Sequence, residues 1–221
     1  EFTEYTNAAD MVIKTLTYKR TFEEKMLGNW QTLFVPFEIP VATLTEMGYE
    51  VAYYNDFRET LDDDLQPIEG KSVIELIKIK KGTLKAGFPY AIKPMTAESL
   101  EMNLELSNVI LKSTNATESI ECSSAFKRFT FCGTYVKATR VDFTGNEDTP
   151  VYSINKDGKM QALSATAKLG AFRVYMTMTN KDGSPYILTP EQAARPISIR
   201  VIGEEDENGA TIIYDVAEDD L

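Results

Sequence analysis

The chain has 221 residues, 43% of them hydrophobic and 26% charged, so it can bury the core of a globular protein. Its 34 acidic and 23 basic residues leave a net charge of −11. That charge repels phosphate backbones and anionic lipid, which argues against nucleic acids and membrane surfaces as partners. Histidine is absent, which excludes Ser-His-Asp and Cys-His nucleophile systems and histidine-containing zinc sites. An all-cysteine zinc site needs four thiolates, and the chain has two cysteines.

Apolar residues recur at every second position along much of the chain, which predicts half-buried β-strands with one wet face. Arg20 is the exception on the apolar side of the first of these segments. The segments that show the alternation are 16–22, 51–57, 77–79, 100–106, 172–178 and 197–201.

Turn and helix signals lie between these predicted strands. Asp-Gly or Asn-Gly ends the segments 155–158, 180–183 and 206–209, and both dipeptides favour tight hairpin turns. Helix is expected only as single turns, at 43–48 and at 189–196, where Thr189 is the predicted N-cap and Pro190 the first helical residue.

Many short strands joined by turns predict an all-β fold, a β-sandwich of two antiparallel sheets with little helix. Residues 1–221 form one all-β region, or they divide at the polar loop 143–150 into a main sandwich, 10–145, and a smaller β unit, 150–221. No run approaches the roughly 20 apolar residues that a membrane-spanning helix needs. The chain starts at Glu1 without a methionine, and we expect that a preceding secretion signal has been removed.

Cys122 and Cys132 flank a polar Phe-Lys-Arg segment that has the character of a hairpin turn. Two cysteines opposite one another across a hairpin can form a disulfide. Two small buried hydrophobic residues fit the same spacing, so both alternatives stay open, and we predict free thiols.

Acidic residues offer the main alternative chemistry. Asp62, Asp63 and Asp64 resemble a calcium-binding cluster, but Pro67 replaces the EF-hand glycine and Val73 its bidentate glutamate. We therefore predict a hairpin loop without metal, and no cofactor. Glycoside hydrolysis by a carboxylate pair needs no histidine and remains chemically open, although the sequence does not single out a pair.

Trp30 and Arg173 each allow two interpretations, a structural role and a ligand-binding role. Trp30 and the 11 tyrosines suit the flat face of a sugar ring, but aromatic residues of a sandwich mostly pack between its sheets, and we predict core packing for Trp30. In Tyr53-Tyr54 one ring must point inward and the other outward. Arg173 lies on the polar side of a predicted strand, where it holds either a ligand carboxylate or a neighbouring strand.

Four segments, in the same order, resemble a β-rich domain of surface and secreted proteins from Bacteroides-type gut bacteria, which often accompanies leucine-rich repeats. The shared residues are mostly apolar strand positions, prolines and glycines, which points to a scaffold. Cys132 has no counterpart in the pattern, and leucine-rich repeats are absent here. The segments are TLTYKRTF with NWQTLFVPFEIP (15–40), GTLKAGFPYAIKP (82–94), IECSSAFKRFTFCGTYV (120–136) and VYSINKDGKM with LGAFRVYM (151–176).

The resemblance implies export and a place at the cell surface, attached to the outer membrane or released from it. It supplies no catalytic, metal-binding or ligand-binding residues. We expect a non-enzymatic structural or adhesive module whose partner is a glycan or a host or bacterial surface protein, with a glycoside hydrolase as the alternative. A cleft lined by aromatic residues and holding two acids about 5 to 10 Å apart would favour the enzyme, and exposed aromatics on a sheet face would favour the binder.

Overall fold

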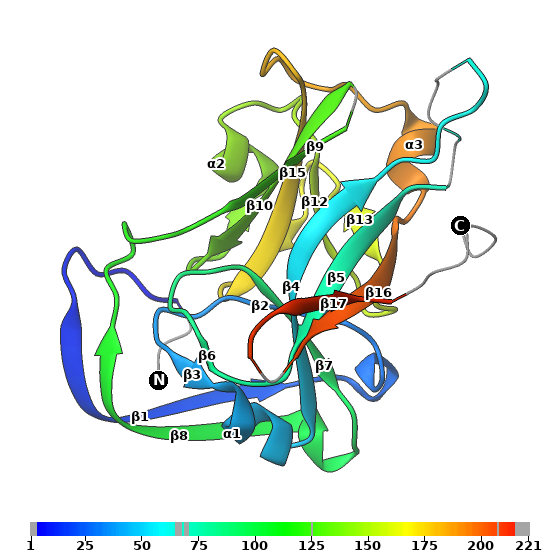
Figure 1. The fold of residues 1–221 in the computed structure, drawn as a ribbon. Helices are drawn as coiled ribbons and strands as arrows, with labels where there is room; N and C mark the ends of the chain where they lie inside the picture. Colours follow the sequence, from blue (N-terminus) through cyan, green and yellow to red (C-terminus); the bar gives the residue numbers. More distant parts are fainter. Residues whose placement is uncertain (1–3, 65–67, 69–70, 125, 207, 215–221) are drawn as a thin grey trace.

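The computed structural model describes residues 4–64, 68, 71–124, 126–206 and 208–214. Most of this part of the chain is β-strand, arranged as two packed sheets with a long two-stranded arm beneath them (Figure 1). The prediction of an all-β fold with little helix is therefore confirmed.

The larger sheet has six strands in the order β17–β16–β5–β4–β7–β2. All its pairs are antiparallel except β5 with β16, which run parallel. The prediction of purely antiparallel sheets is wrong at this pair: no hairpin constrains the direction of two strands so far apart in the chain. The strands are β2 (Gln31–Leu33), β4 (Tyr49–Arg58), β5 (Val73–Ile79), β7 (Tyr90–Pro94), β16 (Ser198–Glu205) and β17 (Thr211–Ile213).

The smaller sheet has five antiparallel strands in the order β13–β12–β15–β10–β9. It combines strands from both sides of the 143–150 loop, and β16 and β17 beyond that loop join the larger sheet. Both sheets therefore draw on the two segments that the predicted subdivision would separate. The strands are β9 (Ile120–Ser123), β10 (Lys127–Thr134), β12 (Val151–Ile154), β13 (Met160–Ala162) and β15 (Arg173–Asn180).

Three further strand pairs complete the β-structure. The longest is the arm, in which β1 and β8 pair along their length from Met11 opposite Leu111 to Thr21 opposite Glu101. The pairs are β1 (Met11–Thr21) with β8 (Glu101–Leu111), β3 (Ile39–Pro40) with β6 (Thr83–Leu84), and β11 (Ala138–Thr139) with β14 (Lys168–Leu169).

Helix is limited to short segments. A capping box between Thr189 and Gln192 starts α3 with Pro190 as its first residue, as predicted. The helix expected at 43–48 begins two residues earlier. Helix α2 was not predicted from the sequence, although Thr139 and Asp142 form a capping box there. The helices are α1 (Val41–Glu46), α2 (Arg140–Thr144) and α3 (Pro190–Ala194), with 3₁₀ turns at Glu24–Met26 and Glu98–Leu100.

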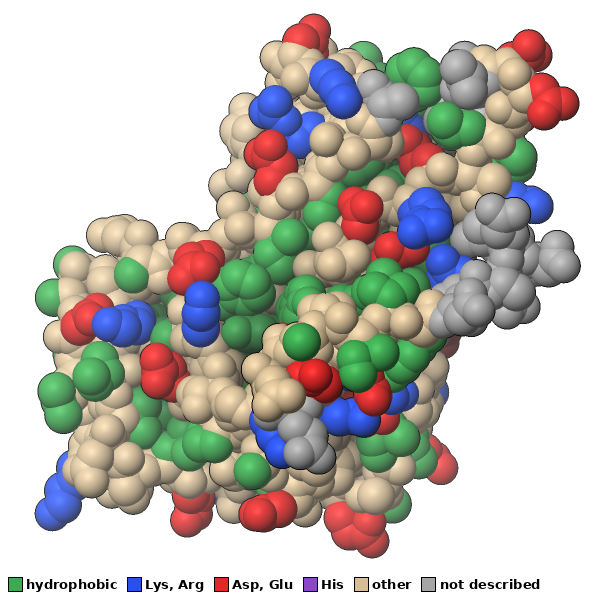
Figure 2. Space-filling view, in the orientation of Figure 1, with side chains coloured by type: hydrophobic (Ala, Val, Ile, Leu, Met, Phe, Trp, Pro, Cys, Tyr) green, Lys and Arg blue, Asp and Glu red, His purple; other side chains and the backbone are tan. Residues whose placement is uncertain are grey.

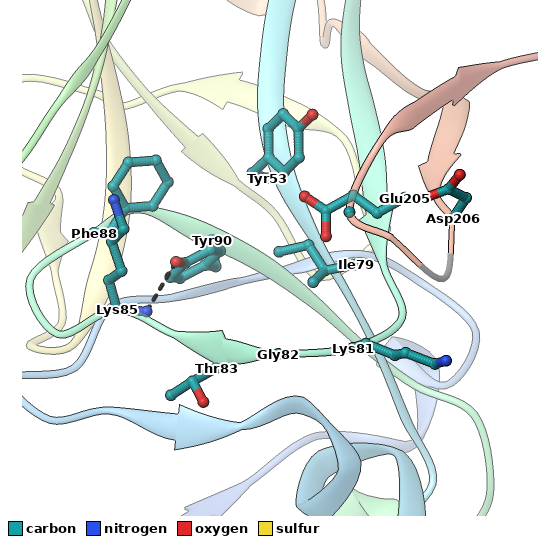
Figure 3. Close-up of a pocket in the computed structure, with 11 residues that line it drawn as sticks. Tyr53, Ile79, Lys81, Gly82, Thr83, Lys85, Phe88, Tyr90, Glu205 and Asp206 are labelled. Carbon is teal, nitrogen blue, oxygen red and sulfur yellow. Dashed lines mark hydrogen bonds between the residues drawn. The ribbon is translucent and has the colours of Figure 1, made fainter.

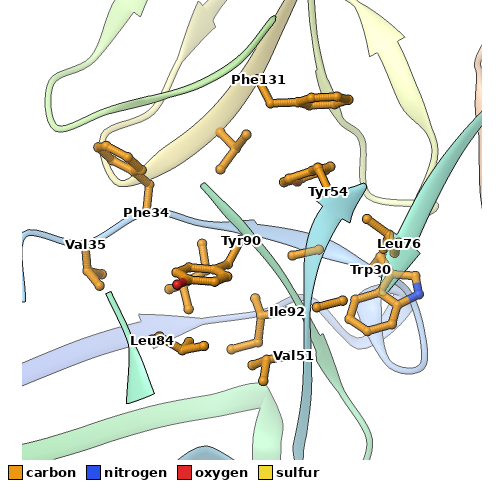
Figure 4. Packing of buried hydrophobic residues seen from close by; sticks show 14 of the residues in the cluster. Trp30, Phe34, Val35, Val51, Tyr54, Leu76, Leu84, Tyr90, Ile92 and Phe131 are labelled. Atoms are coloured by element: carbon orange, nitrogen blue, oxygen red, sulfur yellow. The ribbon is translucent and has the colours of Figure 1, made fainter. Parts of the chain in front are cut away.

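Stacked aromatic rings hold the two sheets together. Tyr54 of β4 stacks on Phe131 of β10 with ring centroids 4.5 Å apart, and Phe57 stacks on Phe129 at 3.8 Å. These rings belong to a hydrophobic cluster that continues through the larger sheet to its other face (Figure 4). Because successive residues of a strand point to opposite faces, Tyr54 enters the inter-sheet core while Tyr53 leaves it.

Cys122 and Cys132 lie in the predicted hairpin, formed by β9 and β10, but they are not opposite one another. Cys122 pairs with Phe129 across this hairpin, and Cys132 pairs with Tyr175 of β15. Both thiols are free. Burial raises the pKa of Cys122 to about 11, so this thiol is protonated and unreactive at neutral pH.

Candidate ligand-binding groove

A groove of about 560 Å³ opens on the face of the larger sheet that carries Tyr53. In the space-filling view, hydrophobic side chains gather near the middle of this face, with acidic and basic side chains around them (Figure 2). The groove is lined by Tyr53, Ile79, Lys81, Gly82, Thr83, Lys85, Phe88, Tyr90, Glu205, Asp206 and Gly209.

The floor of the groove is aromatic because of strand register. Tyr53 of β4 pairs directly with Tyr90 of β7, so both rings point to the same face of the sheet. The Phe88 ring lies 4.9 Å from the Tyr90 ring, tilted by 47°. Tyr90 is almost fully buried, whereas Tyr53 and Phe88 are half-buried and offer ring surface to the groove. Figure 3 shows these three rings on one side of the groove.

One rim is the segment that connects β5 to β7 through β6. Gly82 has a φ of 86°, a left-handed conformation that glycine adopts without strain, and the chain turns there. The Lys85 backbone N–H donates to the Tyr90 hydroxyl at 3.0 Å, which fixes the ring and leaves the hydroxyl proton free to donate. Lys81, Thr83 and Lys85 are exposed along this rim.

The opposite rim is the hairpin turn between β16 and β17, which carries two adjacent acids. The Asp206 carboxylate accepts backbone N–H bonds from Asn208 at 2.8 Å and from Ala210 at 2.9 Å, and these bonds lower its pKa. The Glu205 carboxylate instead points toward Tyr53 and Ile79 (Figure 3). Burial raises its pKa, and within the described residues it forms no hydrogen bond or ion pair.

These residues offer several kinds of contact to a ligand. The groove presents ring faces for apolar C–H surface, a carboxylate acceptor, and ammonium and hydroxyl donors, which together match a polyhydroxylated ring. A carboxylate pair for glycoside hydrolysis requires both acids to face the substrate, and one oxygen of Asp206 is occupied by the two N–H groups of its turn.

Other residues discussed above lie elsewhere. Trp30 is only 8% exposed, as predicted for core packing, and the Lys93 ammonium lies 4.8 Å from its ring centroid. Arg173 lies outside the groove at the start of β15, half-buried, and donates to the Phe172 carbonyl at 3.3 Å. The sequence signal for the groove was the outward ring of Tyr53-Tyr54, but its neighbour Tyr90 follows only from the register.

The acidic segment Asp62–Asp64 lies in the connection between β4 and β5, where Asp62 accepts the Asp64 backbone N–H at 3.0 Å. Residues 65–67, the rest of this predicted loop, lie outside the described residues. Among the described residues, no group of three or more His, Cys, Asp or Glu is arranged to hold a metal ion. The helices of the described part are all too short or too polar to cross a membrane.

Comparison of the chain with known protein families, curated proteins and solved structures finds no match in any of the three. The structure itself defines the protein as an all-β sandwich with an aromatic groove on one sheet face.

Proposed function

We propose that this chain is a non-enzymatic binding module and that the groove takes a saccharide. The observation that carries the proposal is the side-by-side placement of Tyr53 and Tyr90, together with a Glu205 carboxylate that points toward Tyr53 and has no partner among the described residues. A sugar supplies what these groups lack, because its C–H face stacks on the accessible rings of Tyr53 and Phe88 and its hydroxyls donate to the carboxylate.

The proposed setting is the surface of a gut bacterium, either attached to the outer membrane or released from it. It rests on the four segments that resemble the surface domain of Bacteroides-type proteins. In that setting an adhesive module meets dietary or mucosal glycans, and a glycosylated host or bacterial surface protein would offer the same sugars. The net charge of −11 argues against nucleic acid as the partner.

The first test is a binding screen of the purified chain against an array of dietary and mucosal glycans. We expect a hit, and titration calorimetry with that glycan should show Tyr53→Ala weakening binding roughly 2- to 12-fold, the effect of losing one ring contact. Glu205→Gln should weaken it as well. Phe126→Ala is the control, because it removes an exposed ring that does not line the groove.

Three results would overturn the proposal. Silence across the array would move the search to protein partners, and a hit that ignores both groove substitutions would place the sugar elsewhere. Release of reducing sugar from the bound glycan would favour the glycoside hydrolase instead.

A further inference from the structure

A second candidate site lies where the arm meets the smaller sheet, and it begins with Arg20 of β1. This side chain is only 9% exposed. One guanidinium nitrogen donates to the Thr32 carbonyl, and the guanidinium carbon lies 4.3 Å from the centroid of the Phe22 ring. The Arg20 Nε atom is buried and has no hydrogen-bond acceptor in the described part of the chain. A full positive charge is therefore buried against one carbonyl, one ring and the Tyr18 hydroxyl, none of which is an anion.

Arg173, at the start of β15, brings a second guanidinium to this place. Tyr18 lies two residues before Arg20 on the same side of β1, and its ring centroid is 6.0 Å from that of Phe172, the neighbour of Arg173. Phe172 has a φ of 59°, a conformation that is rare for a bulky residue and tends to mark functional positions. The Tyr18 hydroxyl hydrogen-bonds both guanidinium groups, which brings the two cations to one place. Burial and then the charge of Arg173 lower the pKa of Arg20 to about 9.

Neither arginine forms an ion pair with a described carboxylate. On the neighbouring strand of the arm, Glu101 accepts a hydrogen bond from the Thr21 hydroxyl at 2.9 Å. The Tyr54 hydroxyl is also buried without a partner, within range of the Arg20 charge. Unpaired donors and uncompensated charge in one region both indicate a missing acceptor with negative charge.

We propose that Arg20 and Arg173 hold a small anion, either a carboxylate or a halide, between β1 and the start of β15. A guanidinium fork matches the two oxygens of a carboxylate, and the aromatic surroundings of Phe22 and Phe172 exclude competing water. The half-buried Tyr18 and Arg173 side chains give the anion a way in. This site is separate from the groove, so the two proposals stand or fall independently.

The test is thermal unfolding of the whole chain in a bulky sulfonate buffer, with acetate or chloride added at constant ionic strength. A ligand that binds only the folded state lowers the unfolding constant about 11-fold at ten times its dissociation constant. We expect Tm to rise with acetate, with chloride or with both. The anion that gives the larger rise shows whether the site takes a carboxylate or a halide. Arg173→Gln should abolish the rise.

The matched control is Arg128→Gln, which removes the same charge from an exposed arginine of β10 and should keep the rise of the parent chain. Arg173 is half-buried and hydrogen-bonds the Phe172 carbonyl and the Tyr18 hydroxyl, so its replacement should not prevent folding. Three results would overturn the proposal: a Tm indifferent to both anions, an equal rise in Arg173→Gln, or a higher Tm of Arg173→Gln in every buffer. The last would mean that the two cations repel with no ion between them.

Discussion

Two clusters of buried charge in this protein differ in how the charge is balanced. Glu75 of β5 is 1% exposed and pairs with Arg58 Nε at 2.8 Å and with an Arg200 nitrogen at 3.3 Å. Arg20 and Arg173, in contrast, have no carboxylate among the described residues. An unpaired buried charge costs far more than a paired one. The first cluster therefore has a counterion within the chain, although two buried Arg200 nitrogens have no acceptor among the described residues, whereas the second cluster has no described counterion.

The inter-sheet contact follows the first pattern. Lys127 of β10 pairs with Glu59 after β4, and both side chains are almost fully buried. At these two places, charge that joins structural elements is thus paired with an opposite charge within the chain. Unbalanced charge is found at Glu205 in the groove and at the two arginines, which are the two places where we propose ligands.

The largest effect is expected from removing the Glu75 carboxylate, because its two arginines are then left without a carboxylate, as Arg20 and Arg173 are. Glu75→Gln leaves Arg58 and Arg200 without a counterion, and we expect the free energy of unfolding to fall by about 3 kcal/mol. This is the low end for breaking a buried pair, because Arg58 is half exposed and screened by water. Urea unfolding measures the change.

Glu75→Gln also tests whether buried arginines without a carboxylate partner bind small anions. If unbalanced arginines collect anions, acetate should recover part of the stability lost in Glu75→Gln. Glu121→Gln is the control, because it removes the exposed partner of Arg128 and should change stability little. An unchanged urea midpoint for Glu75→Gln would show that the carboxylate partner of these arginines does not stabilise the fold.

A smaller effect of opposite sign is expected at Tyr54, whose hydroxyl is buried without a partner. Tyr54→Phe keeps the stacked ring and removes a desolvated polar group, so stability without small anions should rise by about 1 kcal/mol. Tyr53→Phe should change it little, because that hydroxyl is exposed and lies 3.3 Å from the Thr211 hydroxyl. A loss of stability in Tyr54→Phe would reveal an acceptor for this hydroxyl.

The groove predicts a still smaller effect that depends on pH. Burial raises the folded-state pKa of Glu205, so its ionisation destabilises the fold: the penalty is absent below the unfolded pKa of about 4.3 and complete above the folded pKa. Glu205→Gln removes this penalty. Its Tm should exceed that of the parent chain at neutral pH, and the difference should vanish as pH falls through this range.

Glu147→Gln, at an exposed position after α2, is the charge-matched control and should not reproduce this pH dependence. A Glu205→Gln difference that persists in acid would show that packing, and not ionisation, causes it.

No effect is expected from removing divalent cations. The Asp62 carboxylate is occupied by its own turn, and the calcium pattern fails at Pro67 and Val73. Scanning calorimetry with EDTA and with excess calcium should give the same Tm. A fall of many degrees in EDTA would mean that this segment binds a metal.

Much of the fold could be predicted from alternation, because a strand with one buried face records that face at every second residue. The six alternating segments fall on strands, and Trp30 and Tyr54 are buried. The parallel pairing of β5 with β16 could not be predicted, because it depends on contacts between distant segments. The pairing of Tyr53 with Tyr90 could not be predicted for the same reason.

The proposed anion site gave one signal in the sequence, which could be noticed but not interpreted. Arg20 interrupts the apolar side of its strand, and the structure buries it there. Its relation to Arg173 depends on how the arm packs against the smaller sheet, and alternation carries no information about that packing.

The parallel pairing of β16 with β5 also governs when the chain can finish folding. Arg200 and Glu75 are 125 residues apart, so the edge of β5 waits for nearly the whole chain to leave the ribosome. Closing so distant a contact slows folding, and an open apolar strand edge invites pairing with other chains. Chains that end before β16 should therefore aggregate, and refolding of the complete chain should be slow.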